Sequence, residues 1–280
     1  MLKTMRIVIV LIAAFALAAC ATSPYSSENK AKSDALLAQQ VVQAQATLAE
    51  FATPRLLFVG VAMDDRSTAF RNDVQLAEQV ALAIDPHAVV FKLANPAPLQ
   101  DADWPYATRE NIQQVLQTLG ALARPQDKLM LLLSSHGAPG LLAVHAGHKP
   151  LGVVGASDLA QWLQPLQKQP TLLLVSACFS GSLLDALQQP TRMIFTAAAK
   201  DRVSFGCQSQ SDNTYFIKEL LRQPGLLNLS VREAMQQAQR GVAALEEAQH
   251  LKPPSMPQQH YGKDVQDWSR QKINQWLVFP

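Results

Sequence analysis

A histidine and a cysteine follow two apolar segments of this sequence, at the places where those segments end. The run 129–135 leads into His136-Gly137, and the run 172–177 leads into Cys178. Short apolar runs of this kind predict buried strands, and the carboxyl ends of parallel strands meet at one edge of a sheet, where open α/β folds place their ligand crevices. We therefore expect His136 and Cys178 to meet, although 42 positions separate them in the sequence.

An imidazole beside a thiol makes a nucleophile for acyl chemistry near neutral pH, because the imidazole can take the thiol proton or hold the thiolate. Gly137 lets a substrate carbonyl approach the main chain closely, and its N–H, together with that of Cys178, can receive the oxyanion. The spacing alone fits equally well a buried cysteine and a turn histidine that do no chemistry.

The elements that must position these residues alternate between strand and helix. The strand candidates are 56–62, 88–93, 128–134, 171–176 and 193–197. The helices expected around them are 31–51, 68–84, 108–123, 157–167, 183–187, 214–222 and 230–249. The last of these opens with a Ser230-Val-Arg-Glu233 capping box. Apolar strands that alternate with helices predict an α/β fold with a central, mainly parallel sheet flanked by helices.

The first residues have the three parts of a secretory signal. Lys3 and Arg6 precede the apolar run 7–17, which is short for a membrane span, and small residues lead to Cys20. The Leu-Ala-Ala-Cys ending resembles the lipobox of bacterial lipoproteins, which implies cleavage after residue 19 and a lipid on Cys20. Ala21 at the next position, in place of Asp, implies sorting to the outer membrane. An ordinary signal peptide or an uncleaved anchor is the alternative.

The net charge of the mature chain argues against nucleic acid as a partner. Removal of residues 1–19 takes away two of the 24 basic residues and none of the 22 acidic ones, so the mature chain is formally neutral. A neutral chain without a Lys/Arg stripe has no electrostatic footprint for nucleic acid. Attachment to a membrane through the N-terminal lipid needs no basic surface.

The cysteine and histidine content limits disulfides and metals. With Cys20 used for lipid, only Cys178 and Cys207 remain, which excludes a disulfide-rich scaffold and leaves one disulfide open. His145 and His148 lie three positions apart in a glycine-flanked turn, but no third ligand cluster accompanies them. We therefore expect a solvent-facing loop there, with no metal and no cofactor.

Two motifs resemble those of a known family. "SSHG" (134–137) and "SACFSGS" (176–182) are similar to the His-Gly and Ala-Cys-x-Ser-Gly motifs of the legumain-like cysteine peptidases, peptidase C13, a family related in fold to caspases that includes the transamidase subunit attaching GPI anchors. The likeness covers residues 55–248 and continues in the same order through "FVGVAMDD", "FRND", "ATRENIQQVL", "TAAAKDRVSFGC" and "TYF". It implies a caspase-like three-layer fold. Together the two catalytic motifs are fairly specific, whereas either alone would be weak.

The resemblance implies a role for each matching residue of the catalytic centre. Cys178 is the nucleophile, which forms a thioester, and His136 is the general base and then the acid for the leaving amine. A polar residue after the first strand orients the histidine in the family, and Asp64 or Asp65 occupies that region. The count back from Arg71 favours Asp65, whereas the end of the strand favours Asp64.

The resemblance also implies a pocket for the substrate residue before the scissile bond. Arg71, in "FRND", and Ser204, in "VSFGC", match an arginine and a serine of that pocket. Lys218 and Phe179 stand where legumain-type pockets have acidic residues, which leaves asparagine specificity open. We expect Asp before the scissile bond to be accepted at least as well as Asn, with a small residue as the other possibility.

These observations predict a lipid-anchored cysteine endopeptidase, or a transpeptidase of the same chemistry, acting on peptides or proteins in the periplasm. The competing hypothesis is a non-catalytic lipoprotein that keeps the fold as a scaffold or peptide-binding module. Four parts are expected along the chain: a signal peptide (1–19), a lipidated tether with a helix (20–53), the peptidase domain (54–250) and a tail (251–280).

Overall fold

The computed structural model describes residues 25–147, 149–209 and 211–277 and is built on a six-stranded sheet of order β2-β1-β3-β7-β8-β9. Five strands pair in parallel: β1 (Leu56–Ala62), β2 (Val89–Ala94), β3 (Lys128–Ser134), β7 (Thr171–Ser176) and β8 (Arg192–Thr196). Each lies within one residue of a strand predicted from the sequence. Short apolar runs without interior proline therefore located the centre of the sheet correctly.

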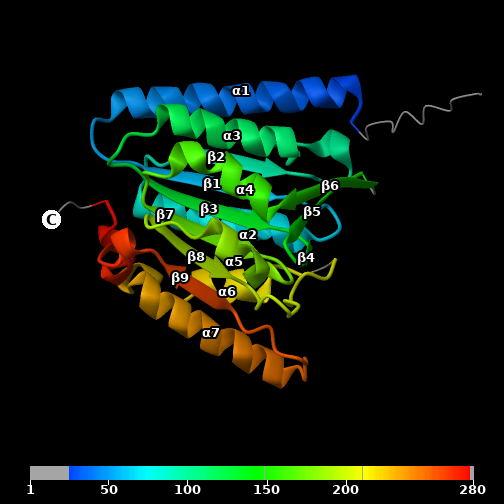
Figure 1. The fold of residues 1–280 in the computed structure, drawn as a ribbon. Helices are drawn as coiled ribbons and strands as arrows, with labels where there is room; N and C mark the ends of the chain where they lie inside the picture. Colours follow the sequence, from blue (N-terminus) through cyan, green and yellow to red (C-terminus); the bar gives the residue numbers. More distant parts are fainter. Residues whose placement is uncertain (1–24, 148, 210, 278–280) are drawn as a thin grey trace, which may run out of the picture.

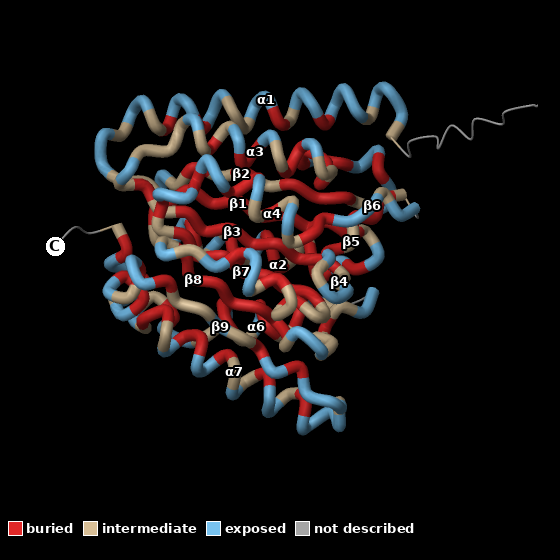
Figure 2. The backbone as a smooth tube through the Cα atoms, viewed as in Figure 1, coloured by how far each residue is buried: buried red, intermediate tan, exposed pale blue. Residues whose placement is uncertain are grey.

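Helices cover both faces of this sheet (Figure 1). One face carries α3 (Arg109–Leu122), α4 (Ala156–Trp162) and α5 (Leu184–Leu187), and the other carries α2 (Thr68–Ile84), α6 (Tyr215–Leu221) and α7 (Val231–Ala248). Along β3, Leu131 belongs to the core on the α3 side and Leu132 to the core on the α2 side, as the alternation of a strand requires. Figure 2 shows the buried sheet between exposed outer helix faces. The predicted three-layer α/β fold is confirmed.

Helix α1 (Ser27–Glu50) lies outside the sheet, along α3 and the edge strand β2 (Figure 1). Leu37 and Ala44 on its inner face are buried in the core. Its Gln40 side chain pairs with the open edge of β2: the amide nitrogen donates to the Lys92 carbonyl at 3.1 Å, and the amide oxygen accepts from the Lys92 N–H at 3.1 Å. A side-chain amide thus satisfies main-chain groups that would otherwise be left open at the edge of the sheet.

Pairings between short segments were not predicted. A second sheet consists of β4 (Gly137–Ala138), β5 (Leu141–Ala146) and β6 (Lys149–Gly155). The segment expected as a tail adds β9 (Gln258–Tyr261), which pairs with β8 in antiparallel orientation. The helix expected over 157–167 ends at Trp162, where a short 3-10 turn containing Pro165 follows, because proline does not continue a helix.

The predicted start of α7 is confirmed, and the end of the described chain packs on the core. The capping box of α7 is present, since Ser230 and Glu233 exchange hydrogen bonds between side chain and main chain. Trp276, in the segment expected as a tail, is buried against the core. Within the described ranges, no helix has the length and apolar character needed to cross a membrane. The signal segment and Cys20 lie outside the described residues.

Candidate active site

The ends of β3 and β7 bring His136 and Cys178 to the same edge of the sheet. The two strands are neighbours, with Ser134 opposite Ser176 as their last paired residues. The Ser135 N–H donates to the Ser176 carbonyl at 3.1 Å, so the pairing continues past the strand ends. His136 and Cys178 each follow two positions after these serines, and the main chains that carry them therefore stay adjacent.

Gly137 is the closest point between the two segments. A Cβ at Gly137 would lie 2.3 Å from the carbonyl oxygen of Cys178, so only glycine fits there. Gly137 pairs with Leu142 of β5, and the Ala143 N–H donates to the His136 carbonyl. In this antiparallel register the N–H of Gly137 points away from β5. It is thus free of the β4–β5 ladder, as an oxyanion donor must be.

A sharp turn after Cys178 projects the thiol from the end of β7. Phe179 has φ of 56° and ψ of 15°, a left-handed conformation that is unusual for a residue with a side chain. Its N–H donates to the Arg202 carbonyl at 2.7 Å. Gly181 lies against the end of β8, where a Cβ would meet the Ala198 carbonyl oxygen at 2.8 Å. These contacts with the Arg202 and Ala198 carbonyls fix the position of the "FSGS" stretch (179–182) and the conformation of the turn.

The thiol of Cys178 is held by hydrogen bonds from the segment that follows β8. The Ser204 N–H donates to Sγ at 3.3 Å, and the Ser204 hydroxyl lies 3.7 Å from Sγ. The pKa of Cys178 is lowered to about 6, because the Cys207 thiol and the Ser204 N–H donate to the sulfur and outweigh burial. Both cysteines are half-buried free thiols, so the structure contains no Cys178–Cys207 disulfide. Cys178 is therefore set up to carry negative charge at neutral pH.

The His136 imidazole is half-buried beside Phe70 of α2. The two rings meet edge to face with 5.0 Å between centroids. Burial lowers the pKa of His136, although the nearby charge of Asp64 opposes this effect. A neutral imidazole at neutral pH can accept a proton, which a general base must do.

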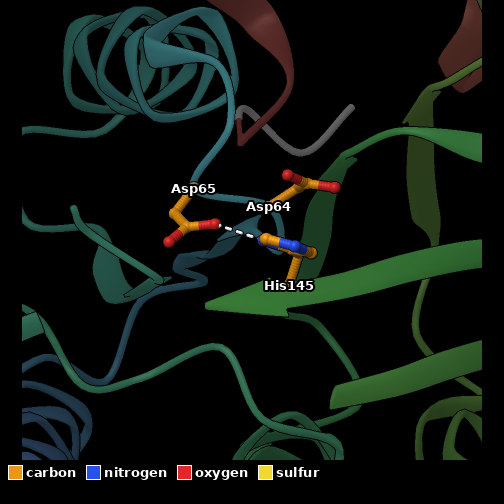
Figure 3. A group of neighbouring side chains, drawn as sticks. All are labelled: Asp64, Asp65 and His145. Carbon is orange, nitrogen blue, oxygen red and sulfur yellow. Dashed lines mark hydrogen bonds and ion pairs between the residues drawn. The ribbon is translucent and has the colours of Figure 1, made fainter. Parts of the chain in front are cut away.

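Of the two candidate orienting carboxylates, Asp64 is the one whose charge acts on His136. Its side chain is buried and accepts hydrogen bonds from Arg66, from the main-chain N–H at 3.0 Å and from Nε at 2.9 Å. Burial would raise the pKa of Asp64, but these hydrogen bonds lower it below its usual value. Asp65 instead points to His145, whose Nδ1 lies 2.6 Å from its Oδ1 (Figure 3).

The expectation of a solvent-facing loop at His145 is wrong. His145 belongs to β5 and is 8% exposed, because β5 runs back across the end of β1. The main-chain N–H of His145 donates to the Met63 carbonyl at 2.9 Å, and the His145 carbonyl accepts from the main-chain N–H of Asp65 at 3.3 Å. His148 lies outside the described residues.

Three of these side chains have the composition of a metal site. Asp64, Asp65 and His145 place one possible ligand atom each within 4.8 Å of one another (Figure 3). Arg66 already binds both carboxylate oxygens of Asp64, and Nδ1 of His145 already bonds Asp65. A cation would have to displace these contacts. The second carboxylate oxygen of Asp65, Oδ2, is buried and has no hydrogen-bond partner among the described residues.

Of the three residues assigned to the substrate pocket, Ser204 contacts the Cys178 thiol, whereas Arg71 binds other side chains and Lys218 is exposed. Arg71 forms an ion pair with Asp103 at 2.6 Å, and its guanidinium lies 4.1 Å from the centre of the Trp104 ring. Lys218 is exposed on α6. Because Lys218 is exposed, its identity gives no support to a preference for Asp over Asn.

Arg66 is the guanidinium whose charge acts on His136, and the sequence interpretation missed it. Its side chain is 49% exposed while bound to Asp64. The available signal was its place in the polar stretch directly after the first strand. That stretch also holds Asp64 and Asp65, which the same reasoning did assign to the site.

A family model and a solved structure are similar to this chain. No curated protein matches the chain. A solved structure, caspase-1 from Spodoptera frugiperda, is similar with a TM-score of 0.48 and 16% identity, over 74% of this chain and 86% of that chain. The model of the peptidase C13 family matches residues 110–277, which include His136, Cys178 and Ser204. This chain therefore belongs to the peptidase C13 family of cysteine peptidases, the family that its two motifs indicated.

Proposed function

We propose that this protein is a cysteine endopeptidase in which Cys178 is the nucleophile and His136 the general acid and base. The observation that carries the proposal is the Cys178 thiol itself: the Ser204 N–H donates to its sulfur at 3.3 Å, and the donors from Cys207 and Ser204 lower its pKa. It follows the end of β7, and the neighbouring end of β3 leads into a glycine N–H and an imidazole that can accept a proton. A thiol that served only packing would need none of these neighbours.

The geometry supports a two-step reaction. The Cys178 thiolate attacks the carbonyl carbon of the scissile bond, and the Gly137 N–H stabilises the oxyanion. The neutral imidazole of His136 takes the proton of the Cys178 thiol as this thiolate forms, and it delivers the same proton to the leaving amine, which leaves a thioester on Cys178. Water then attacks the thioester carbonyl and gives its proton to His136. The carbon–sulfur bond breaks, so the carboxylic acid product leaves and the Cys178 sulfur is free again. An amine in place of water would give transpeptidation from the same intermediate.

Turnover of a peptide library by the reduced protein tests this function. We expect cleavage by the wild type and none by Cys178→Ala or His136→Ala. Gln239→Ala, on the far helix α7, is a control that removes a hydrogen bond to the Pro257 carbonyl without touching the site. Equal signals from wild type and Cys178→Ala would favour the non-catalytic scaffold. Addition of an amine nucleophile, with product analysis by mass, separates hydrolysis from ligation.

For specificity we propose that Arg66, with Ser204, receives the residue before the scissile bond. A guanidinium offers five donors, and the Arg66 side chain remains half-exposed while it binds Asp64. The remaining N–H groups fit the oxygen of an Asp or Asn side chain. Arg66 takes the role first assigned to Arg71, whose guanidinium is occupied by Asp103 and Trp104.

We also propose that the protein is anchored by a lipid on Cys20 and faces the periplasm from the outer membrane. The support is the Leu-Ala-Ala-Cys sequence after a short apolar run, with Ala21 at the sorting position. Cys20→Ser should leave the precursor unlipidated and release it from the outer-membrane fraction. A variant that still fractionates with outer membranes as the wild type does would contradict the anchor.

A further inference from the structure

Asp73 is a fully buried carboxylate on the sheet-facing side of α2, close to the predicted dyad and without a role in the reaction described above. Four donors surround it. Oδ1 accepts from Asn213 Nδ2 at 3.0 Å and from the Thr214 N–H at 3.1 Å. Oδ2 accepts from the hydroxyls of Ser134 and Thr214, each at 2.8 Å. Burial of a carboxyl is costly without such partners, so every one of these contacts matters to its placement.

Asp73 is linked, directly or through Thr214, to the residues that end the strands leading to His136 and Cys178. Ser134 is the last residue of β3, two positions before His136. Ser176 is the last residue of β7, two positions before Cys178, and its hydroxyl lies 2.8 Å from the Thr214 hydroxyl. A continuous hydrogen-bonded chain therefore runs from Ser134 through Asp73 and Thr214 to Ser176. It joins the ends of both strands beneath the dyad.

The Asp73 carboxylate also binds the end of the segment whose Ser204 N–H donates to the Cys178 thiol. Asn213 and Thr214 end the stretch that begins after β8 and contains Ser204 and Cys207. The Tyr215 N–H donates to the Phe205 carbonyl at 3.1 Å, so the end of this stretch is linked to the residue that follows Ser204. Displacement of Thr214 would therefore shift the main chain next to Ser204, whose N–H donates to the Cys178 sulfur.

We propose that Asp73 is a positioning residue of the proposed peptidase: it fixes His136, Cys178 and the Ser204 N–H relative to one another through Ser134, Ser176 and Thr214. The inference rests on the proposed Cys178–His136 chemistry, but it makes a separate claim about how the dyad is held. Displacements of about 1 Å between reacting groups cost on the order of 100-fold in rate, so a shared anchor for three elements affects turnover directly.

The fold contains a matched control. Asp127 is also a fully buried carboxylate with four donors, namely the N–H groups of Arg55 and Arg124 and two nitrogens of the Arg124 side chain. It lies just before β3, at the end of that strand opposite to His136. Loss of either carboxylate should destabilise the protein, but only the loss of Asp73 should disturb the dyad.

The experiment compares Asp73→Ala, Asp73→Asn, Ser176→Ala and Asp127→Ala. Peptide turnover is measured, together with the rate and pH midpoint of iodoacetamide alkylation of Cys178, mapped by mass spectrometry. Asp73→Ala should lower kcat by about 10- to 100-fold with a smaller change in KM, and shift the alkylation midpoint. Asp73→Asn should restore both, because its amide can donate to the hydroxyls of Ser134 and Thr214 while its oxygen accepts from the other two donors.

Ser176→Ala keeps the carboxylate and removes one link, so it tests the chain of hydrogen bonds if Asp73→Ala does not fold. It should lower kcat and change alkylation in the same direction, by a smaller factor. Asp127→Ala should lower the melting temperature and leave kcat and alkylation unchanged. The proposal is overturned if folded Asp73→Ala, or Ser176→Ala in its absence, behaves like Asp127→Ala. A wild type without turnover would refute the proposed function, and the alkylation data would still decide the role of Asp73.

Discussion

The main chain of Gly137 lies directly against that of Cys178, so closely that a methyl group on Gly137 would meet the Cys178 carbonyl oxygen at 2.3 Å. This contact joins the histidine segment to the cysteine segment. It also sets the position of the N–H assigned to the oxyanion. The glycine is therefore required by the geometry of the site as well as by the approach of a substrate.

Gly137→Ala should reduce peptide turnover by about 100-fold or more, because the two segments must separate and the oxyanion donor moves. Overpacking of this kind costs about 1 to 3 kcal/mol of stability, so the variant should still fold. Gly155→Ala is the matched control, because an added Cβ there has 3.4 Å to its nearest neighbour. Steady-state turnover and thermal melting of both variants check this, and a fully active Gly137→Ala would show that the contact is dispensable.

The reactivity of Cys178 should follow the donors on its sulfur. Hydrogen bonds from Cys207 and Ser204 lower its pKa, so alkylation by iodoacetamide should be half-maximal at a lower pH than for an ordinary cysteine. Cys207→Ala removes the first of these donors and should move the midpoint upward, whereas Cys207→Ser keeps a hydroxyl donor and should move it less. Alkylation rates measured across pH on the reduced protein provide the test. An unchanged midpoint in Cys207→Ala would mean that Ser204 alone stabilises the thiolate.

The preference for Asp or Asn before the scissile bond should depend on Arg66. Arg66→Gln removes the charge and should lower kcat/KM for Asp substrates by about 10-fold or more, which corresponds to about 1.4 kcal/mol. Arg71→Gln should have little effect, since that guanidinium is bound to Asp103 and lies over Trp104. Paired peptides that differ only at this position measure both variants. Loss of selectivity in Arg71→Gln with none in Arg66→Gln would reverse the assignment.

Stability should depend on pH through Asp73. Burial raises the pKa of Asp73 from 3.8 to about 7 against the opposing effect of its hydrogen bonds. Between these two values the folded protein binds more protons at this site than the unfolded chain, so its contribution to the unfolding free energy falls as pH rises. Asp73→Asn does not titrate and should gain stability relative to the wild type over that range.

Urea denaturation at about pH 4.5, 6 and 8 gives this difference. Both proteins should carry Cys178→Ala so that self-digestion does not interfere. A difference between the two proteins that is constant across pH would show that Asp73 does not exchange a proton on unfolding in this range.

The sequence by itself determined the centre of the sheet and the adjacency of the segments that carry His136 and Cys178. The strands 56–62, 128–134 and 171–176 coincide with β1, β3 and β7 because each is a short apolar run buried on both faces, a property of local sequence. The carboxyl ends of neighbouring parallel strands share an edge, so the adjacency of His136 and Cys178 followed from two local patterns. The motifs around His136 and Cys178 then indicated the peptidase C13 family.

Tertiary structure alone decided the direction in which the surrounding side chains point. Asp64 and Asp65 are adjacent and chemically equal in the sequence, yet one faces Arg66 and His136 and the other bonds His145. That difference depends on β5, whose pairing with the end of β1 joins residues about 80 positions apart. Short, partly polar strands such as β4 and β9 leave no periodic signal, because their stability comes from partners distant in the chain.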